Sequence, residues 1–361
     1  MEELYAQARL VNPSILAVRP YSPGKSISAL RQEFGLDEII QLSCNENAAG
    51  PSPLAMKAVD AVIRNVHRYP DDEGPLKSAL ALKHGVAEGN IILGHGATDI
   101  LEIIVRTFVC PNDEMVLAHP AFPWFHILGQ LSGARNVVVP LREHCHDLEA
   151  MAKHCTAKTK LVLIANPNNP TGTFLPRAQI EAFVRALPSH VVAVLDEAYI
   201  EYAPPHQEFD FGTVAEAPVI VVRTFSKISG LAGLRIGYAV TSKKVADLME
   251  KARQPFNTTA IAHAAALASL RDIEHIQKSR RMVAEGKVFL YREFDRLGLD
   301  YVATEANFIF VDFRREAKAV VDSLMQRGVL IRPVMESCAR ITIGSAEQNA
   351  ALVSALQSAL L

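Results

Sequence analysis

Lys227, a residue whose amine can act as a nucleophile, lies within the segment Arg223 to Gly237. The apolar run Val219 to Val222 precedes it and follows Pro218, a pattern typical of a short buried strand. Lys227 would therefore lie just past the carboxyl end of a strand, where open α/β sheets bind their ligands. Because lysine amines form Schiff bases with carbonyl compounds, this position predicts covalent chemistry.

Other residues near the lysine suit a phosphorylated ring. Ser226 can donate a hydroxyl hydrogen bond to a phosphate, and Arg235 is a permanent forked cation. A carboxylate, Asp196, follows the apolar run Val191 to Leu195. In a site for pyridoxal phosphate, such a carboxylate pairs with the protonated ring nitrogen. The alternatives are a surface position for Lys227 and a helix-capping role for Asp196.

Three further side chains could complete a ring-binding site. Tyr199 and Asn169 could hydrogen-bond a ring hydroxyl, and Phe122 could stack on the ring face. Each of these residues follows an apolar run, as Lys227 and Asp196 do. Their shared position after strands is the strongest indication that they belong to one site.

A strand, turn and helix pattern at 90–108 predicts an anion site. The small residues Gly96, Ala97 and Thr98 would let backbone amides approach an anion at the helix N-terminus, where the helix dipole favours it. The rival interpretation is a dinucleotide-binding turn, but Asp99 replaces its third glycine.

The elements that position these residues alternate between apolar runs and amphipathic helices, which predicts an α/β fold with a mostly parallel sheet covered on both faces. The predicted strands are 91–93, 115–118, 161–165, 191–195 and 219–222. After 257 the pattern changes to a long helix, 272–297, and shorter strands at 308–311 and 340–343. We therefore expect an N-terminal arm (1–40) packing on a small α+β domain (256–361), and a large cofactor-binding domain (41–255).

Composition excludes several classes of protein. The 361 residues are 49% hydrophobic and 21% charged, with a formal net charge of -2, so no basic surface indicates nucleic acid. The five cysteines are scattered, which favours free thiols in a reducing compartment over a disulfide framework. The chain shows neither a signal peptide nor a run long enough to span a membrane. We expect a cytoplasmic protein.

Two other chemistries are weakly indicated. His144, Cys145, His146, His154 and Cys155 resemble a metal cluster, but their spacing matches no familiar zinc pattern, so we expect no metal. A serine–lysine hydrolase built on Ser226 and Lys227 would leave Asp196 and the proline-rich turn at Asn169 unexplained.

Taken together, these motifs resemble the fold-type-I pyridoxal phosphate aminotransferases, and within them the histidinol-phosphate aminotransferase family. The resemblance rests on NPNNPTG at 166–172, DEAY at 196–199, RTFSK at 223–227 and GLAGLRIGY at 230–238. It extends over nearly the whole chain through RPY at 19–21, NE at 45–46, RYP at 68–70, QPFN at 254–257, NF at 307–308, IRP at 331–333 and RITIG at 340–344.

The resemblance implies a role for each matching residue. Lys227 would carry pyridoxal 5'-phosphate and act as the base, Asp196 would hold the ring nitrogen, and Asn169 and Tyr199 would hold the ring oxygen. Tyr69 would reach the cofactor phosphate from the neighbouring subunit of a homodimer. The residues expected to bind substrate, either the phosphate of histidinol phosphate or the carboxylates of glutamate and 2-oxoglutarate, are Tyr21, Asn45, Arg332 and Arg340.

The chain also departs from the family pattern. Ala48 replaces a usual proline, Phe125 stands where a tyrosine is common, and the loop between Arg332 and Arg340 is short. Because that loop would face the substrate, an aromatic aminotransferase and a decarboxylase of a phosphorylated amino acid such as threonine phosphate stay open. A ligand-sensing domain of a transcription regulator would need a basic helix-turn-helix extension, and a nicotinamide dehydrogenase is the remaining enzyme alternative.

Overall fold

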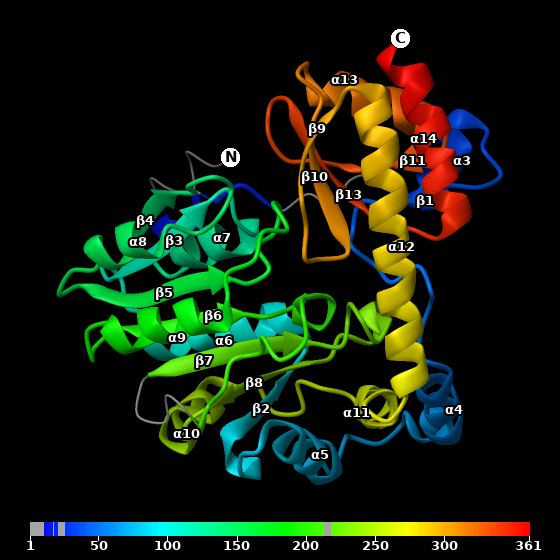
Figure 1. Ribbon diagram of the computed structural model, residues 1–361. Helices are drawn as coiled ribbons and strands as arrows, with labels where there is room; N and C mark the ends of the chain where they lie inside the picture. The colour runs from blue at the N-terminus through cyan, green and yellow to red at the C-terminus, as the bar shows by residue number, and fades with distance from the viewer. Residues whose placement is uncertain (1–10, 17, 21–25, 213–217) are drawn as a thin grey trace.

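A seven-stranded sheet forms the centre of the larger part of the computed structural model, which describes residues 11–16, 18–20, 26–212 and 218–361 (Figure 1). The strand order is β2-β8-β7-β6-β5-β3-β4, and β8 runs antiparallel to both of its neighbours while the other pairs are parallel. The strands are β2 (Ile91–Gly94), β3 (Glu114–His119), β4 (Arg135–Pro140), β5 (Thr159–Ala165), β6 (Val192–Asp196), β7 (Val219–Thr224) and β8 (Gly237–Thr241). The predicted mostly parallel sheet is confirmed.

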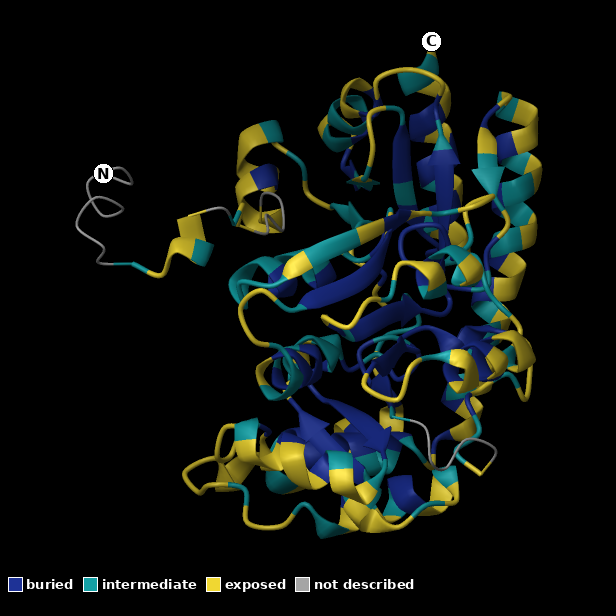
Figure 2. Ribbon diagram, turned by 90° about the vertical axis from the view of Figure 1, so that its left-hand side faces the viewer, coloured by how far each residue is buried: buried dark blue, intermediate teal, exposed yellow. Residues whose placement is uncertain are grey.

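Helices cover both faces of this sheet, as its uniformly apolar strands require. One face packs against α6 (Ala97–Phe108), α7 (Pro123–Leu131) and α10 (Lys243–Ala252). The other packs against α8 (Leu148–Lys153) and α9 (Arg177–Ala186), and, towards β2 and β8, against α4 (Pro53–Val62), α5 (Gly74–His84) and α11 (Ala260–Ser269). The central strands are therefore buried along their length (Figure 2).

A second, antiparallel sheet forms the C-terminal part of the molecule, in the order β12-β13-β10-β9. Its strands are β9 (Asp300–Val302), β10 (Phe308–Asp312), β12 (Arg332–Pro333) and β13 (Cys338–Thr342), packed with α13 (Ala317–Gln326) and α14 (Ala346–Leu360). The long helix α12 (Ile273–Leu297) runs alongside both parts (Figure 1). Asp272 caps its first turn, and Gly298 ends it at a φ of 68°.

The N-terminal segment contacts both parts of the molecule. Helix α2 (Pro13–Leu16) lies against α7, and α3 (Ile27–Phe34) is followed by the two-residue strand β1 (Ile40–Gln41). Strand β1 pairs in parallel with β11 (Val329–Leu330) of the C-terminal part. Our domain division stays a prediction, and α11, just after the proposed boundary at 255, packs with α4 of the larger part.

The boundaries differ from expectation in a few places. The strands expected at 191–195 and 340–343 are β6 (Val192–Asp196) and β13 (Cys338–Thr342), each shifted by one or two residues. Helix α4 ends at Val62, where the chain tightens into the 3-10 helix η1 (Ile63–Asn65). Strand β4, at the sheet edge, and strand β8 were not predicted. The apolar residues of β4 are a run of only three valines that follows Arg135 and Asn136. The other 3-10 turns are η2 (Glu88–Asn90), η3 (Ile200–Tyr202) and η4 (Ala232–Leu234).

We expect Gly286→Ala to destabilise the protein, although alanine is normally the better helix former by about 1 kcal/mol. A Cβ at 286 would lie 2.4 Å from Cγ2 of Ile343 and 3.0 Å from Nδ2 of Asn349. Overpacking of this kind costs about 1–3 kcal/mol, which should lower the urea midpoint of unfolding.

Val288→Ala is the matched control on the same helix, since Val288 is 72% exposed. It should change the free energy of unfolding by less than about 0.5 kcal/mol. A Gly286→Ala protein that unfolds at the wild-type urea concentration would contradict the packing argument.

Candidate active site

A cavity of about 270 Å³ lies at the carboxyl ends of β5, β6 and β7. Strands that run parallel place these ends at one edge of the sheet, so the residues that follow them converge there. The residues that line it include Cys44, Asn45, Ala97, Thr98, Phe122, Asn169, Asp196, Tyr199, Ser226, Lys227, Arg235 and Arg340. Most of the side chains predicted from separate motifs therefore share one cavity.

Lys227 is partly buried in this cavity, and its amine donates a hydrogen bond to the backbone carbonyl of Cys44 at 3.1 Å. Burial, together with the positive charge of Arg340, lowers the pKa of Lys227 from 10.5 to about 8. A lowered pKa leaves more of the amine neutral at physiological pH, and only the neutral amine is a nucleophile. The lysine is thus prepared for attack on a carbonyl carbon.

Asp196 ends β6 and is 7% exposed. Its Oδ1 accepts a hydrogen bond from the backbone N–H of Ala198 at 3.1 Å. Burial raises its pKa to about 6, while that hydrogen bond and the charge of Lys227 act in the opposite direction. The carboxylate is therefore mostly ionised at neutral pH, and a protonated ring nitrogen would be a suitable partner.

Tyr199 lies at the centre of a hydrogen-bonded group opposite the lysine. Its hydroxyl accepts from Nδ2 of Asn45 at 2.9 Å and from Nδ2 of Asn169 at 3.5 Å. Burial raises the pKa of Tyr199, so the hydroxyl keeps its proton and can donate it to a ring oxygen. Arg340 donates to Oδ1 of Asn169 at 2.7 Å and thereby orients that amide.

An anion cradle lies beside the lysine, at the N-terminus of α6. Gly96 caps this helix with a φ of 81°, and a Cβ there would lie 2.5 Å from a guanidinium nitrogen of Arg235. That nitrogen also lies 3.5 Å from Oγ1 of Thr98. Ser226 is buried next to them, and its Oγ accepts from the hydroxyl of Thr224 at 2.9 Å. Helix dipole, hydroxyls and a fixed cation together suit a phosphate.

A second cavity of about 520 Å³ adjoins the first and shares Phe122, Asn169 and Arg340 with it. Arg332 also lines this second cavity, and it lies directly opposite Arg340 in the β12–β13 pair. Like charges opposite one another destabilise a strand pair, so a bound anion would offset their repulsion. The cavity is therefore suited to a substrate that carries negative charge.

Among the predicted residues that the structure describes, Gly96 and Tyr69 line neither cavity, and Gly96 contributes as the cap of α6. Tyr69 is 76% exposed, lines neither cavity and stacks on Phe256 with ring centroids 4.6 Å apart. Tyr21 lies outside the described residues, although Arg19 lines the second cavity. The predicted role of Tyr69 in the neighbouring subunit stays a prediction.

Sequence reasoning missed the residues that hold the predicted ones in place. Asn45 has a φ of 56°, and its backbone carbonyl accepts from Nδ2 of Asn307 at 3.1 Å. Thr342 bonds both the backbone N–H and the side chain of Asn45. Asn307 and Thr342 belong to the motifs at 307–308 and 340–344, but those motifs do not indicate the contact with Asn45, which lies more than 250 positions away along the chain.

A buried ion pair joins the carboxyl ends of β6 and β7. Arg223, which precedes the lysine turn, pairs with Glu197, which follows Asp196, and both are nearly inaccessible to solvent. Burial raises the pKa of Glu197, and the charge of Arg223 opposes that shift. The pair connects β6 to β7 beside their functional residues, so Arg223 has a structural role that its place in the motif did not reveal.

Among the described residues, no group of His, Cys, Asp and Glu side chains is arranged to hold a metal ion. His146, part of the pattern that resembles a metal cluster, is buried, and its Nε2 lies 3.0 Å from the carbonyl of Ala165. None of the helices within the described ranges combines the length and apolarity that a membrane crossing requires.

We expect Lys227 to react with trinitrobenzenesulfonate, an amine-selective reagent, with a midpoint near pH 8, because its amine loses its proton there. Burial disfavours the charged form, so the neutral amine is reached at a lower pH than usual. Peptide mass measurement on the cofactor-free protein would follow the reaction. Lys318 is the control, because its hydrogen bond to Asp322 raises its pKa. Lys227 labelling that needs as high a pH as Lys318 would contradict the expectation.

Comparison with known proteins agrees with this geometry. The family model "Aminotransferase class I and II" matches residues 37–356. The histidinol-phosphate aminotransferase of Moorella thermoacetica is 41% identical, over 99% of this chain and 95% of that protein. Histidinol-phosphate aminotransferase 1 of Cupriavidus pinatubonensis is 45% identical, over 96% and 95% of the two chains.

Solved structures give the same result. The crystal structure of histidinol-phosphate aminotransferase from Sinorhizobium meliloti in complex with pyridoxal-5'-phosphate has a TM-score of 0.90 and 31% identity, covering 97% of each chain. That similarity extends over both parts of the molecule and agrees with the fold-type-I expectation. The chain belongs to the class I and II aminotransferases.

Proposed function

We propose that this aminotransferase uses pyridoxal 5'-phosphate to transfer an amino group between L-histidinol phosphate and 2-oxoglutarate, a step of histidine biosynthesis. The observation that carries the proposal is the presence of the Lys227 amine, the Asp196 carboxylate and an anion cradle in one cavity. Relatives named histidinol-phosphate aminotransferase, at 41–45% identity over nearly the whole chain, support the substrate.

The residues of the cavity match each chemical group of the cofactor. Asp196 would pair with the ring nitrogen, Tyr199 and Asn169 would hold the ring oxygen, and Phe122 would stack on the ring. The phosphate would be bound by Gly96, Ala97, Thr98, Ser226 and Arg235. Bound pyridoxal phosphate supplies an electron sink beside the carbon that carries the amino group. Lys227 would hold the cofactor covalently and move the proton at that carbon.

The substrate would occupy the second cavity, between the cofactor and the β12–β13 pair. Arg332 and Arg340 would receive either the phosphate of histidinol phosphate or the carboxylates of glutamate and 2-oxoglutarate, because guanidinium groups bind both kinds of anion by forked hydrogen bonds. We also assign Asn45 and Tyr21 to substrate binding, the latter by its family motif. Aromatic amino acids and threonine phosphate stay as alternatives for assay.

We further propose a cytoplasmic homodimer in which Tyr69 reaches the cofactor phosphate of the partner subunit. The cysteines Cys44, Cys110, Cys145, Cys155 and Cys338 are free, which fits a reducing compartment. The high exposure of Tyr69 fits a side chain that contacts another molecule.

Lys227→Ala should lower kcat/KM by at least about 10²–10⁴-fold, because it removes the group that transfers the proton. Borohydride reduction should attach pyridoxal phosphate to residue 227 of the wild type and leave the variant unlabelled, as judged by peptide mass. Lys318→Ala, on the exposed face of α13, should behave as the wild type. A Lys227→Ala protein with wild-type activity would refute the assignment.

Histidinol phosphate should be the preferred donor when it is assayed beside phenylalanine, tryptophan and threonine phosphate. Arg332→Gln should raise KM for histidinol phosphate by about 10-fold or more, since a hydrogen bond to a charged group contributes about 1.5–3 kcal/mol. KM for an uncharged aromatic side chain should change less. Faster turnover of phenylalanine than of histidinol phosphate would favour the aromatic alternative, and release of carbon dioxide from threonine phosphate would favour the decarboxylase.

A further inference from the structure

Tyr69 and Phe256 form an aromatic pair on the surface of the larger part. The two rings are 76% and 58% exposed, and their centroids lie 4.6 Å apart. Phe256 has a φ of 55°, a left-handed backbone conformation that is strained for a bulky residue. Such strain persists only where neighbouring groups hold the backbone in place.

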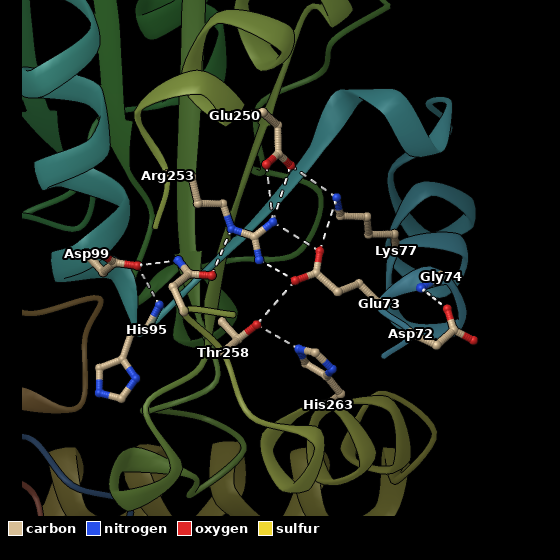
Figure 3. Close-up of polar contacts among 11 residues, drawn as sticks. Asp72, Glu73, Gly74, Lys77, His95, Asp99, Glu250, Arg253, Thr258 and His263 are labelled. Carbon is tan, nitrogen blue, oxygen red and sulfur yellow. Dashed lines mark hydrogen bonds and ion pairs between the residues drawn. The ribbon is translucent and has the colours of Figure 1, made fainter. Parts of the chain in front are cut away.

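The group that holds both segments is Arg253, whose side chain is 9% exposed (Figure 3). Its guanidinium donates to both carboxylate oxygens of Glu73, at 3.1 Å for Nη1 to Oε2 and at short range for Nη2 to Oε1. Burial alone would raise the pKa of Glu73, but the hydrogen bond and charge of Arg253 lower it. The forked pair therefore joins the segment after Tyr69 to the segment before Phe256.

The same guanidinium is also linked, through two other side chains, to the anion cradle of its own subunit. Nε of Arg253 donates to Oδ1 of Asn257 at 2.8 Å, and Nδ2 of Asn257 donates to Oδ2 of Asp99 at 2.8 Å. Oδ2 of Asp99 also accepts from the backbone N–H of His95, at 2.8 Å. These contacts hold the turn that leads into Gly96, as Figure 3 shows for the labelled residues.

We propose that Arg253 is a positioning residue for two cofactor sites at once. Through Glu73 and the stacked rings it would hold Tyr69 for the partner subunit, and through Asn257 and Asp99 it would hold the phosphate-binding turn of its own subunit. The inference rests on the proposed homodimer and cofactor. It follows that each cofactor phosphate in the dimer depends on both copies of Arg253.

Arg253→Gln should weaken pyridoxal phosphate binding at least about tenfold, as loss of hydrogen bonds to a charged group implies. The affinity is measured by equilibrium dialysis of the dimer, and kcat at saturating cofactor should stay within about twofold, because Arg253 lines neither cavity. Arg292→Gln removes an exposed arginine paired with Glu293 and should leave the affinity unchanged.

Removing one partner of a partly buried ion pair can destabilise a protein, so Glu73→Gln combined with Arg253→Gln serves as a second variant. It removes one charge of each sign, and the two remaining partners, Glu250 and Lys77, still pair with each other. It should show the same loss of affinity. Arg253→Lys keeps the charge but loses the fork, and should recover affinity only in part. Wild-type affinity in folded Arg253→Gln would overturn the proposal.

Hybrid dimers separate the effect on Tyr69 from the effect on the phosphate-binding turn, because Lys227→Ala inactivates one of the two active sites. In the first hybrid a wild-type subunit is paired with a subunit that carries both Lys227→Ala and Arg253→Gln. The functional active site then has a normal phosphate-binding turn, and only the Tyr69 that the variant subunit supplies to it is affected. In the second hybrid a Lys227→Ala subunit is paired with an Arg253→Gln subunit. The functional active site then lies in the Arg253→Gln subunit and receives Tyr69 from a subunit with an intact Arg253, so only the phosphate-binding turn is affected. The reference hybrid pairs a Lys227→Ala subunit with a wild-type subunit. Both test hybrids should need a higher concentration of pyridoxal phosphate for half-maximal activity than the reference hybrid does.

The outcomes distinguish the proposals. A first hybrid that matches the reference hybrid would overturn the role of Arg253 across the interface, and a second that matches it would overturn the role within the subunit. Wild-type protein that binds no pyridoxal phosphate would instead refute the proposed function itself.

Discussion

The convergence of parallel strand ends is the constraint on which the site depends. Strands β5, β6 and β7 run side by side in one direction, so Asn169, Asp196 and Lys227 emerge at one edge of the sheet. Each follows a strand whose burial leaves it little freedom to shift. A chain with the same motifs on an antiparallel sheet would place alternate residues at opposite edges, and no common cavity would form.

Charge balance explains much of what surrounds these residues. Three cations, Lys227, Arg235 and Arg340, line the cavity together with two carboxylates, Asp196 and Glu46, so the cations outnumber the carboxylates. Their mutual repulsion contributes to the lowered pKa of Lys227. An anionic ligand would relieve that repulsion, which is why a phosphorylated cofactor and a charged substrate suit the site better than neutral molecules.

The two parts of the molecule have different tasks. The larger sheet presents the cradle, the carboxylate and the lysine, while Arg340 comes from β13 and Asn45 lies just after β1, whose partner strand β11 belongs to the C-terminal part. Asn45 and Asn169 both bond Tyr199, so the cavity is closed by contacts between segments far apart in sequence. The same principle holds at the surface, where Arg253 connects segments 180 positions apart.

Local sequence was sufficient for the fold class, for five of the seven strands of the larger sheet and for most of the residues in the cavity. Apolar runs and helical periodicity are short-range signals, and the motifs after each strand lie within a few positions of their strand ends. It could not indicate β8 as the antiparallel strand, the support of Asn45 by Asn307 and Thr342, the Arg223–Glu197 pair or the network of Arg253. Those contacts join distant segments, and only the packed tertiary structure decides which distant side chains meet, because their geometry depends on the whole fold and not on any local pattern.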